Sequence, residues 1–182
     1  MKSKVLALIL LCGAASLGAK VKLPALVGDN MILQQQTEVK LWGTAAPEAE
    51  VRVTPSWNGQ TMTCRADKDG GWTLAVETPA AGYTPYEITF DDGEKTTLKN
   101  ILIGEVWLAS GQSNMEMPLK GFAGCCIMNG ADDIIVSAEN KGVRMFTVPK
   151  HQTYELQTDC KGSWNISSIE TAPDFSATAY YF

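Results

Sequence analysis

Within its first half the chain reads Gly71-Trp72-Thr73-Leu74-Ala75-Val76-Glu77, with a large apolar side chain at every second position. This period is typical of a half-buried antiparallel strand, because successive side chains point to opposite faces of a sheet. The same alternation recurs between residues 38 and 90, in Val39/Leu41, Val51/Val53, Met62/Cys64/Ala66 and Tyr86/Ile88/Phe90. Turn residues that tolerate positive φ separate the runs: Asn58-Gly59, Asp69-Gly70-Gly71 and Asp92-Gly93. Residues 20–100 are therefore predicted to form a β-sandwich.

A different pattern begins after Asn100. Ile101-Leu102-Ile103 and Val106-Trp107-Leu108-Ala109 form a nearly continuous apolar stretch, typical of a strand buried on both faces. Residues 131–140 predict a short helix, and residues 143–148 predict a second strand. Strand, helix and strand indicate a βαβ unit with parallel strands, so we expect residues 101–182 to be the first part of an α/β domain. Two strands do not complete a parallel sheet, and we interpret the chain as truncated.

The first nineteen residues have the order of a secretory signal peptide. Lys2 and Lys4 precede an apolar run from Val5 to Leu11, and small residues follow up to Ala19. The apolar run is shorter than the roughly 20 residues that span a bilayer. We therefore expect a secreted or periplasmic protein that is not attached to a membrane after cleavage. The chain has 15 Lys and Arg against 20 Asp and Glu and has no basic runs, which argues against a nucleic-acid partner.

Ser113 is the candidate for chemistry in the second half. It follows the predicted buried strand by four residues, and open α/β sheets bind ligands beyond the carboxyl ends of their strands. Free amides of a helix beginning there can stabilise an oxyanion. Ser113 with Glu116 also fits a capping box, and Met115 replaces the second glycine of the Gly-x-Ser-x-Gly elbow. Spacing alone leaves a nucleophile and a helix cap as equal alternatives.

A longer stretch distinguishes these alternatives. The chain reads Gly104-Glu105-Val106-Trp107-Leu108-Ala109-Ser110-Gly111-Gln112-Ser113-Asn114-Met115-Glu116, which resembles the nucleophile block of the SGNH-type sialate O-acetylesterase family. The resemblance extends to residues 23–35, 159–164 and 172–177. It implies an amino-terminal fragment of such an esterase, with a β-sandwich followed by the first part of an SGNH (flavodoxin-like) α/β hydrolase domain.

The resemblance also implies roles for individual residues. Ser113 would attack the acetyl carbonyl of an O-acetylated carbohydrate, with sialic acids as the expected substrates, and its own amide would contribute to the oxyanion hole. We expect Gln112 and Asn114 to support the serine loop and Glu116 to cap the helix.

A serine hydroxyl needs a base to take its proton, usually a histidine. The single histidine, His151, follows the second predicted strand, so it is either a candidate base at the same sheet edge or an exposed loop residue. The resemblance places the family's catalytic histidine, and further glycine and asparagine oxyanion donors, later than this sequence reaches. We therefore expect little or no activity from this chain.

The cysteines predict structure and not chemistry. Adjacent Cys125 and Cys126 with a lone histidine match no zinc-ligand spacing, so neither a metal nor another cofactor is expected. Because a bridge between adjacent cysteines is strained, the hypothesis is a disulfide from one of them to Cys160. The related family often has a further cysteine where Ser167 stands, which leaves this pairing open. Cys64 is expected to pack in the sandwich.

A second function is also consistent with the sequence. Trp57, Tyr83 and Tyr86 are aromatic residues that either stack on sugar rings or pack within the sandwich. The alternative to an esterase is therefore a non-catalytic module that binds carbohydrate or braces a catalytic domain.

Overall fold

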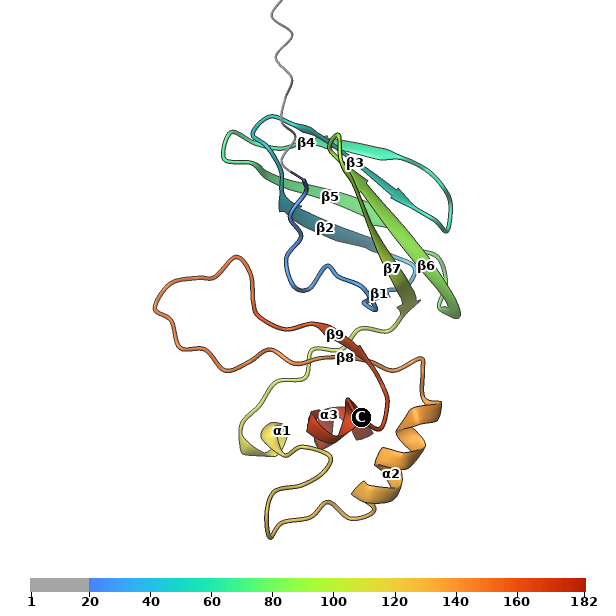
Figure 1. The fold of residues 1–182 in the computed structure, drawn as a ribbon, viewed down its shortest axis with the longest axis vertical. Helices are drawn as coiled ribbons and strands as arrows, with labels where there is room; N and C mark the ends of the chain where they lie inside the picture. The colour runs from blue at the N-terminus through green and yellow to red at the C-terminus, as the bar shows by residue number, and fades with distance from the viewer. Residues whose placement is uncertain (1–19) are drawn as a thin grey trace, which may run out of the picture.

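The computed structural model describes residues 20–182, which form a two-layered β part and a smaller part with short helices (Figure 1). The predicted signal peptide, residues 1–19, lies outside the described residues. None of the described helices is long and apolar enough to cross a membrane.

Two sheets make up the β part. The larger has the strand order β1-β7-β6-β3-β4, and the smaller pairs β2 with β5. The bounds in the larger sheet are β1 (Ile32–Gln34), β7 (Lys95–Gly104), β6 (Gly82–Asp91), β3 (Glu50–Pro55) and β4 (Met62–Arg65), and in the smaller sheet β2 (Glu38–Thr44) and β5 (Gly71–Glu77). All pairs are antiparallel except β1 with β7, in which Ile32 lies opposite Leu102. The larger sheet is therefore mixed.

One hydrophobic core lies between the sheets, and the alternating residues build it. Leu41, Val51, Val76, Ile88 and Phe90 are each at most 1% exposed. Burial of each large apolar side chain contributes roughly 1.5–3 kcal/mol. The predicted face of every alternating run is confirmed, because its members are buried or pack against this core.

The predicted turns are also confirmed. Gly59, Gly70 and Gly93 all have positive φ. Gly70 has a second constraint, because a Cβ atom at this position would lie 2.5 Å from the carbonyl oxygen of Ala45. A glycine is therefore required between β4 and β5.

The stretch after Asn100 departs from the prediction in two ways. Residues 101–103 are buried, as expected, but they continue β7 within the larger sheet, so the proposed division after residue 100 falls inside a strand. Residues 106–109 form no strand, and Trp107 and Leu108 are 68% and 95% exposed. Apolar character alone does not make a strand where no partner strand is available for its backbone.

The second part consists of short elements. They are α1 (Ser113–Glu116), α2 (Gly130–Val136), the 3-10 turn η1 (Ser137–Glu139), β8 (Arg144–Phe146), β9 (Trp164–Ile166), the 3-10 turn η2 (Ala172–Asp174) and α3 (Ala177–Tyr181). The helix predicted over residues 131–140 is confirmed as α2 with η1. The parallel βαβ unit is wrong, because β8 pairs antiparallel with β9 and not with β7. A small second core of Leu119, Met145, Ala172 and Ala177 holds these elements together.

Polar contacts join the two parts. Arg144 on β8 donates from Nη2 to Oδ1 of Asn100 at 3.2 Å, and Asn100 donates in turn to Oδ1 of Asn30 at 2.7 Å. The Trp164 indole on β9 donates to the carbonyl of Leu26 at 2.8 Å. The strand pair β8–β9 is thereby fixed against the edge of the sandwich that β1 and β7 form (Figure 1).

Candidate active site

Ser113 is the first residue of α1 and is exposed. The residue at the N-cap position is Gln112, and no side-chain hydrogen bond caps this helix. The capping-box alternative is therefore wrong, because a capping box needs Ser113 at the N-cap position, with its hydroxyl accepting a hydrogen bond from a backbone amide. The Ser113 hydroxyl is left available to a substrate.

The loop before Ser113 is closely packed around a glycine. The amide of Met115 donates to the carbonyl of Gln112 at 2.9 Å, which closes the turn into α1. A Cβ atom at Gly111 would lie 2.6 Å from Cγ of Met115. A larger residue at position 111 would require the Met115 side chain to shift.

Helix α3 supports α1 from the side, and the two lie side by side in Figure 1. The Thr178 hydroxyl donates to the carbonyl of Asn114 at 3.0 Å, and the amide of Ala177 donates to the carbonyl of Met117 at 2.8 Å. Asn114 is thus held through its backbone. In residues 20–182 the side chains of Gln112 and Asn114 make no hydrogen bond within the chain, so their predicted support of the loop stays a prediction.

Glu116 does not cap the helix, which corrects the expected role. Its Oε1 lies 2.6 Å from Nζ of Lys150, and both side chains are partly exposed. An exposed ion pair of this kind contributes roughly 0–1 kcal/mol. Its effect on the site is to tie the loop after β8 to the helix that begins at Ser113.

His151 follows Lys150 directly and is exposed. Among the described residues it makes no hydrogen bond, to Ser113 or to any carboxylate. The ion pair of Lys150 with Glu116 therefore holds the segment that contains His151 near α1. His151 itself does not pair with Ser113.

A clasp of two glutamines, which no sequence pattern predicts, fixes the start of the Ser113 block. Gln34 and Gln35 donate from Nε2 to the two carboxylate oxygens of Glu105, at 2.9 and 2.7 Å. Their own Oε1 atoms accept the amides of Val106 and Ala81, both at 2.9 Å. The two donated bonds hold the pKa of the Glu105 carboxyl below its usual value. The clasp joins residues 34–35 to the Ser113 block, residues 104–116; the family resemblance rests on both stretches.

The cysteines are free throughout the described chain, so the bridge predicted between Cys160 and Cys125 or Cys126 is absent from this structure. Cys64 packs against the sandwich core, as expected, and burial raises the pKa of its thiol. Ser167 is fully buried and donates to the carbonyl of Ser137 at 3.0 Å. Among residues 20–182 no group of three or more His, Cys, Asp or Glu side chains is placed to hold a metal.

The three aromatic residues considered for sugar binding differ in their surroundings. Trp57 donates its indole N–H to the carbonyl of Glu77 at 3.0 Å and packs edge-on against Tyr86 at 5.7 Å. These two rings are therefore packing residues of the sandwich. Tyr83 is 86% exposed.

Comparisons with known proteins relate most of the chain to esterases. No protein-family profile matches the chain. It is 27% identical over 175 residues to a sialate O-acetylesterase of Rattus norvegicus, an alignment covering 88% of this chain and 31% of the relative. The human sialate O-acetylesterase is 29% identical over 161 residues, covering 82% of this chain and 29% of the relative.

A solved structure extends this similarity to the fold. A carbohydrate acetylesterase from Xanthomonas citri superposes with a TM-score of 0.80 at 31% identity, over 88% of this chain and 36% of that one. The chain thus spans about a third of the length of the proteins that it matches. The resemblance read from the Ser113 block is confirmed: over most of its length this chain is similar, in sequence and fold, to sialate O-acetylesterases and to a carbohydrate acetylesterase of known structure.

Proposed function

We propose that the chain carries the nucleophile of a serine esterase that removes O-acetyl groups from sialic acids or related carbohydrates. The observation that carries this proposal is the placement of Ser113, which stands exposed at the first position of α1 within the block that resembles the esterases. The similarity to acetylesterases over more than four-fifths of the chain supports it.

The chemistry has two steps. The Ser113 Oγ attacks the acetyl carbonyl and gives up its proton to a base, and the sugar oxygen leaves as a hydroxyl after it receives a proton. Water then attacks the acetyl-serine ester, which releases acetate and restores the Ser113 hydroxyl. In the tetrahedral stage the amide of Ser113, which has no partner inside the helix at this first position, contributes to the oxyanion hole.

The base determines how active this chain is on its own. His151 is the candidate within the sequence, but it makes no hydrogen bond to Ser113. Without a paired base a serine hydrolase loses roughly 10⁴ to 10⁶ in turnover. We therefore propose that this chain alone has trace activity, and that a base outside these residues serves in the complete enzyme.

The proposal extends to the domain order, the export and the substrate of the protein. The β-sandwich is followed, after β7, by the first part of an SGNH-type α/β domain, and the protein is secreted or periplasmic through the signal peptide at residues 1–19. The substrate is an O-acetylated carbohydrate, and neither a nucleic acid nor a membrane is a partner of the mature chain.

The second candidate is a bracing role for the sandwich. The glutamine clasp on Glu105 favours it, because this contact fixes the direction in which the chain leaves β7 toward Ser113. The two candidates are compatible, since a braced serine loop is what an esterase needs.

Acetate release from O-acetylated sialic acid tests the proposal. The full chain is compared with Ser113→Ala and with Ser110→Ala, which removes another exposed serine of the same loop. We expect slow acetate release that disappears in Ser113→Ala and stays within a few-fold in Ser110→Ala. Equal rates in the parent and in Ser113→Ala would refute the assignment of the nucleophile.

A further inference from the structure

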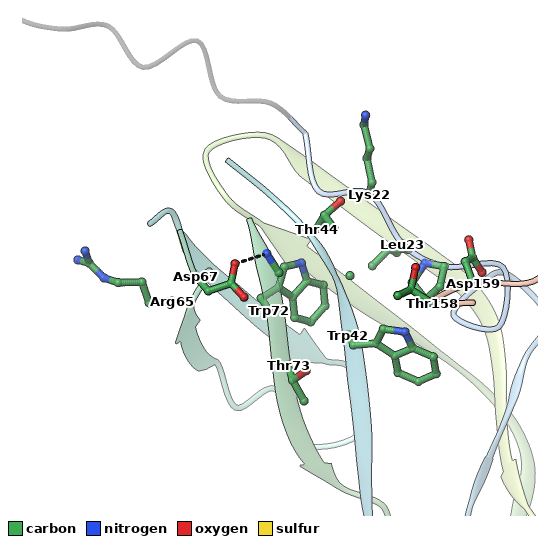
Figure 2. Close-up of a pocket in the computed structure, with 13 residues that line it drawn as sticks. Lys22, Leu23, Trp42, Thr44, Arg65, Asp67, Trp72, Thr73, Thr158 and Asp159 are labelled. Atoms are coloured by element: carbon green, nitrogen blue, oxygen red, sulfur yellow. Dashed lines mark hydrogen bonds between the residues drawn. The ribbon is translucent and has the colours of Figure 1, made fainter. Parts of the chain in front are cut away.

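A groove lies on the outer side of the smaller sheet (Figure 2). No residue of α1, where Ser113 lies, lines it. Its volume is about 810 Å³, and β2, β5, the segment before β1 and the loop before β9 line it. Its chemistry comes from Trp42, two carboxylates (Asp67 and Asp159) and two cations (Lys22 and Arg65). We propose that this groove binds a neutral oligosaccharide, as a site separate from Ser113.

Trp42 supplies the platform. It lies on β2 beside Leu41, which is 1% exposed and faces the core, so the alternation of the strand turns the Trp42 side chain to the outer face. The indole is half-buried and borders a second, smaller hollow as well. In Figure 2 it lies next to Thr158 and Asp159, and the Trp72 ring lies between it and Asp67. A held indole of this kind offers an apolar face to the C–H groups of a sugar ring.

The two carboxylates are held in the same way. Oδ1 of Asp67 accepts the amides of Asp69 and Gly71, both at 2.8 Å. Oδ1 of Asp159 accepts the amides of Ala25 and Cys160, at 2.9 and 2.7 Å. Each bond pair fixes the side chain and leaves Oδ2 without a hydrogen bond among the described residues. Two oriented carboxylate oxygens are strong acceptors for sugar hydroxyls, and their geometry is set before a ligand arrives.

The charges indicate which sugars fit. Lys22 and Arg65 line the groove together with Asp67 and Asp159, and Arg65 is paired with Glu48 at 3.6 Å. The groove therefore has no excess positive charge that would select an anion. Lys22 is positioned by its backbone, which exchanges hydrogen bonds of 2.8 and 2.9 Å with Thr44. A hydroxyl-rich neutral chain uses the acceptors and the indole together, whereas a sialylated glycan would place its carboxylate beside Asp67 or Asp159.

The site goes beyond acetyl ester cleavage and does not depend on it. A glycan held here would keep the protein on a polysaccharide while another region acts on acetyl groups. Because binding needs neither Ser113 nor a base, Ser113→Ala should bind the oligosaccharide as the parent does. Failure of the esterase proposal and failure of this one are therefore distinguishable.

Indole NMR tests the proposal directly, because the chain has five tryptophans and each gives one N–H signal. The full chain with ¹⁵N-labelled tryptophan is titrated with cellohexaose, xylohexaose and mannohexaose, and with sialyllactose as the anionic probe. We expect at least one neutral hexasaccharide to shift the Trp42 signal, which Trp42→Phe identifies, and to leave the Trp57 signal in place. No shift of Trp42 with any neutral probe at millimolar concentration would overturn the proposal, as would a shift with sialyllactose alone.

Variants then separate the groove from the rest of the surface. Trp42→Ala should raise the dissociation constant about tenfold, the effect of losing one stacked ring. Asp67→Asn keeps the Oδ1 acceptor and removes the free oxygen, so it should weaken binding several-fold in a chain that still folds. Tyr83→Ala, which removes an exposed aromatic outside the groove, should bind as the parent does. Unchanged binding in both Trp42→Ala and Asp67→Asn would place the glycan elsewhere and contradict the proposal.

Discussion

Ser167→Ala is the substitution whose effect the structure specifies most fully. Ser167 is fully buried, and its hydroxyl donates to the carbonyl of Ser137 at 3.0 Å and lies 3.2 Å from the hydroxyl of Tyr180. Each hydrogen bond contributes roughly 0.5–1.5 kcal/mol to stability. The Ser137 carbonyl keeps a second donor, the amide of Asn140 at 3.1 Å, so it is not left unsatisfied. We therefore expect a loss of about 1–2 kcal/mol, at the lower end for a buried polar change.

Thermal and urea unfolding measure this loss. For a chain of this size each kcal/mol lowers Tm by about 2–4 °C, so Tm should fall by about 2–8 °C. Ser163→Ala is the matched control, because Ser163 is exposed and its hydroxyl makes no hydrogen bond in the described chain. Equal urea midpoints for Ser167→Ala and Ser163→Ala would contradict this expectation. Because Tyr180 lies on α3, which holds the carbonyl of Asn114, amide exchange at α1 should also speed up in Ser167→Ala.

Three further outcomes are expected. The hydrogen bond to Asp133 raises the pKa of Tyr181 to about 12. This hydrogen bond therefore stabilises the fold below the unfolded tyrosine pKa near 10, and the stabilisation is lost as pH rises through the folded pKa. Ultraviolet titration of Asp133→Asn should show the Tyr181 pKa falling back toward 10. The pKa of Glu105 is lowered in the folded chain, so the glutamine clasp stabilises the fold above the unfolded carboxyl pKa, and this stabilisation is lost as pH falls through the folded pKa. Glu105→Ala should remove this loss of stability at acid pH, measured by urea unfolding. An unchanged pH dependence in Glu105→Ala would assign the loss to other carboxylates. His151→Ala should leave Ser113-dependent acetate release within a few-fold of the parent, and a loss of a hundredfold or more would instead make His151 the base.

The strands of the sandwich were predictable because their signal is local. Most apolar side chains of the strands from β2 to β6 lie on one face, and the positive-φ glycines Gly59, Gly70 and Gly93 mark the turns after β3, β4 and β6. The parallel pairing of β1 with β7 was not predictable, since β1 is only three residues long and its partner is about 70 residues away in the chain. Partner choice for a strand this short depends on the sheet edge that is already formed.

The part of the chain from α1 to α3 was less predictable, because its apolar stretches do not coincide with strands. Residues 106–109 match a buried strand in composition, but Trp107 instead packs edge-on against Phe182 at 5.0 Å. The β8–β9 pair spans a loop of 17 residues, from 147 to 163, and both strands are only three residues long. No turn signal in the sequence relates two strands across such a distance.

The prediction of Ser113 as a nucleophile rests on a motif and not on periodicity. Spacing alone left a capping box open, and only the observed position of Ser113 as the first helical residue excludes it. The contacts that support the loop come from distant residues, Thr178 through the Asn114 carbonyl and Gln34 through Glu105. Such contacts depend on the tertiary fold, so the sequence predicts Ser113 as a candidate nucleophile but not the residues that surround it.

The site of acetylation is the most direct test of Ser113 as the nucleophile. The chain is incubated with an activated acetyl ester, quenched in acid to preserve an acetyl-serine ester, and analysed by peptide mass spectrometry. We predict one acetyl group on the peptide that contains Ser113, assigned to Ser113 and absent in Ser113→Ala. An acetyl group that persists on this peptide in Ser113→Ala, or that is found on Ser110 or His151 instead, would contradict it.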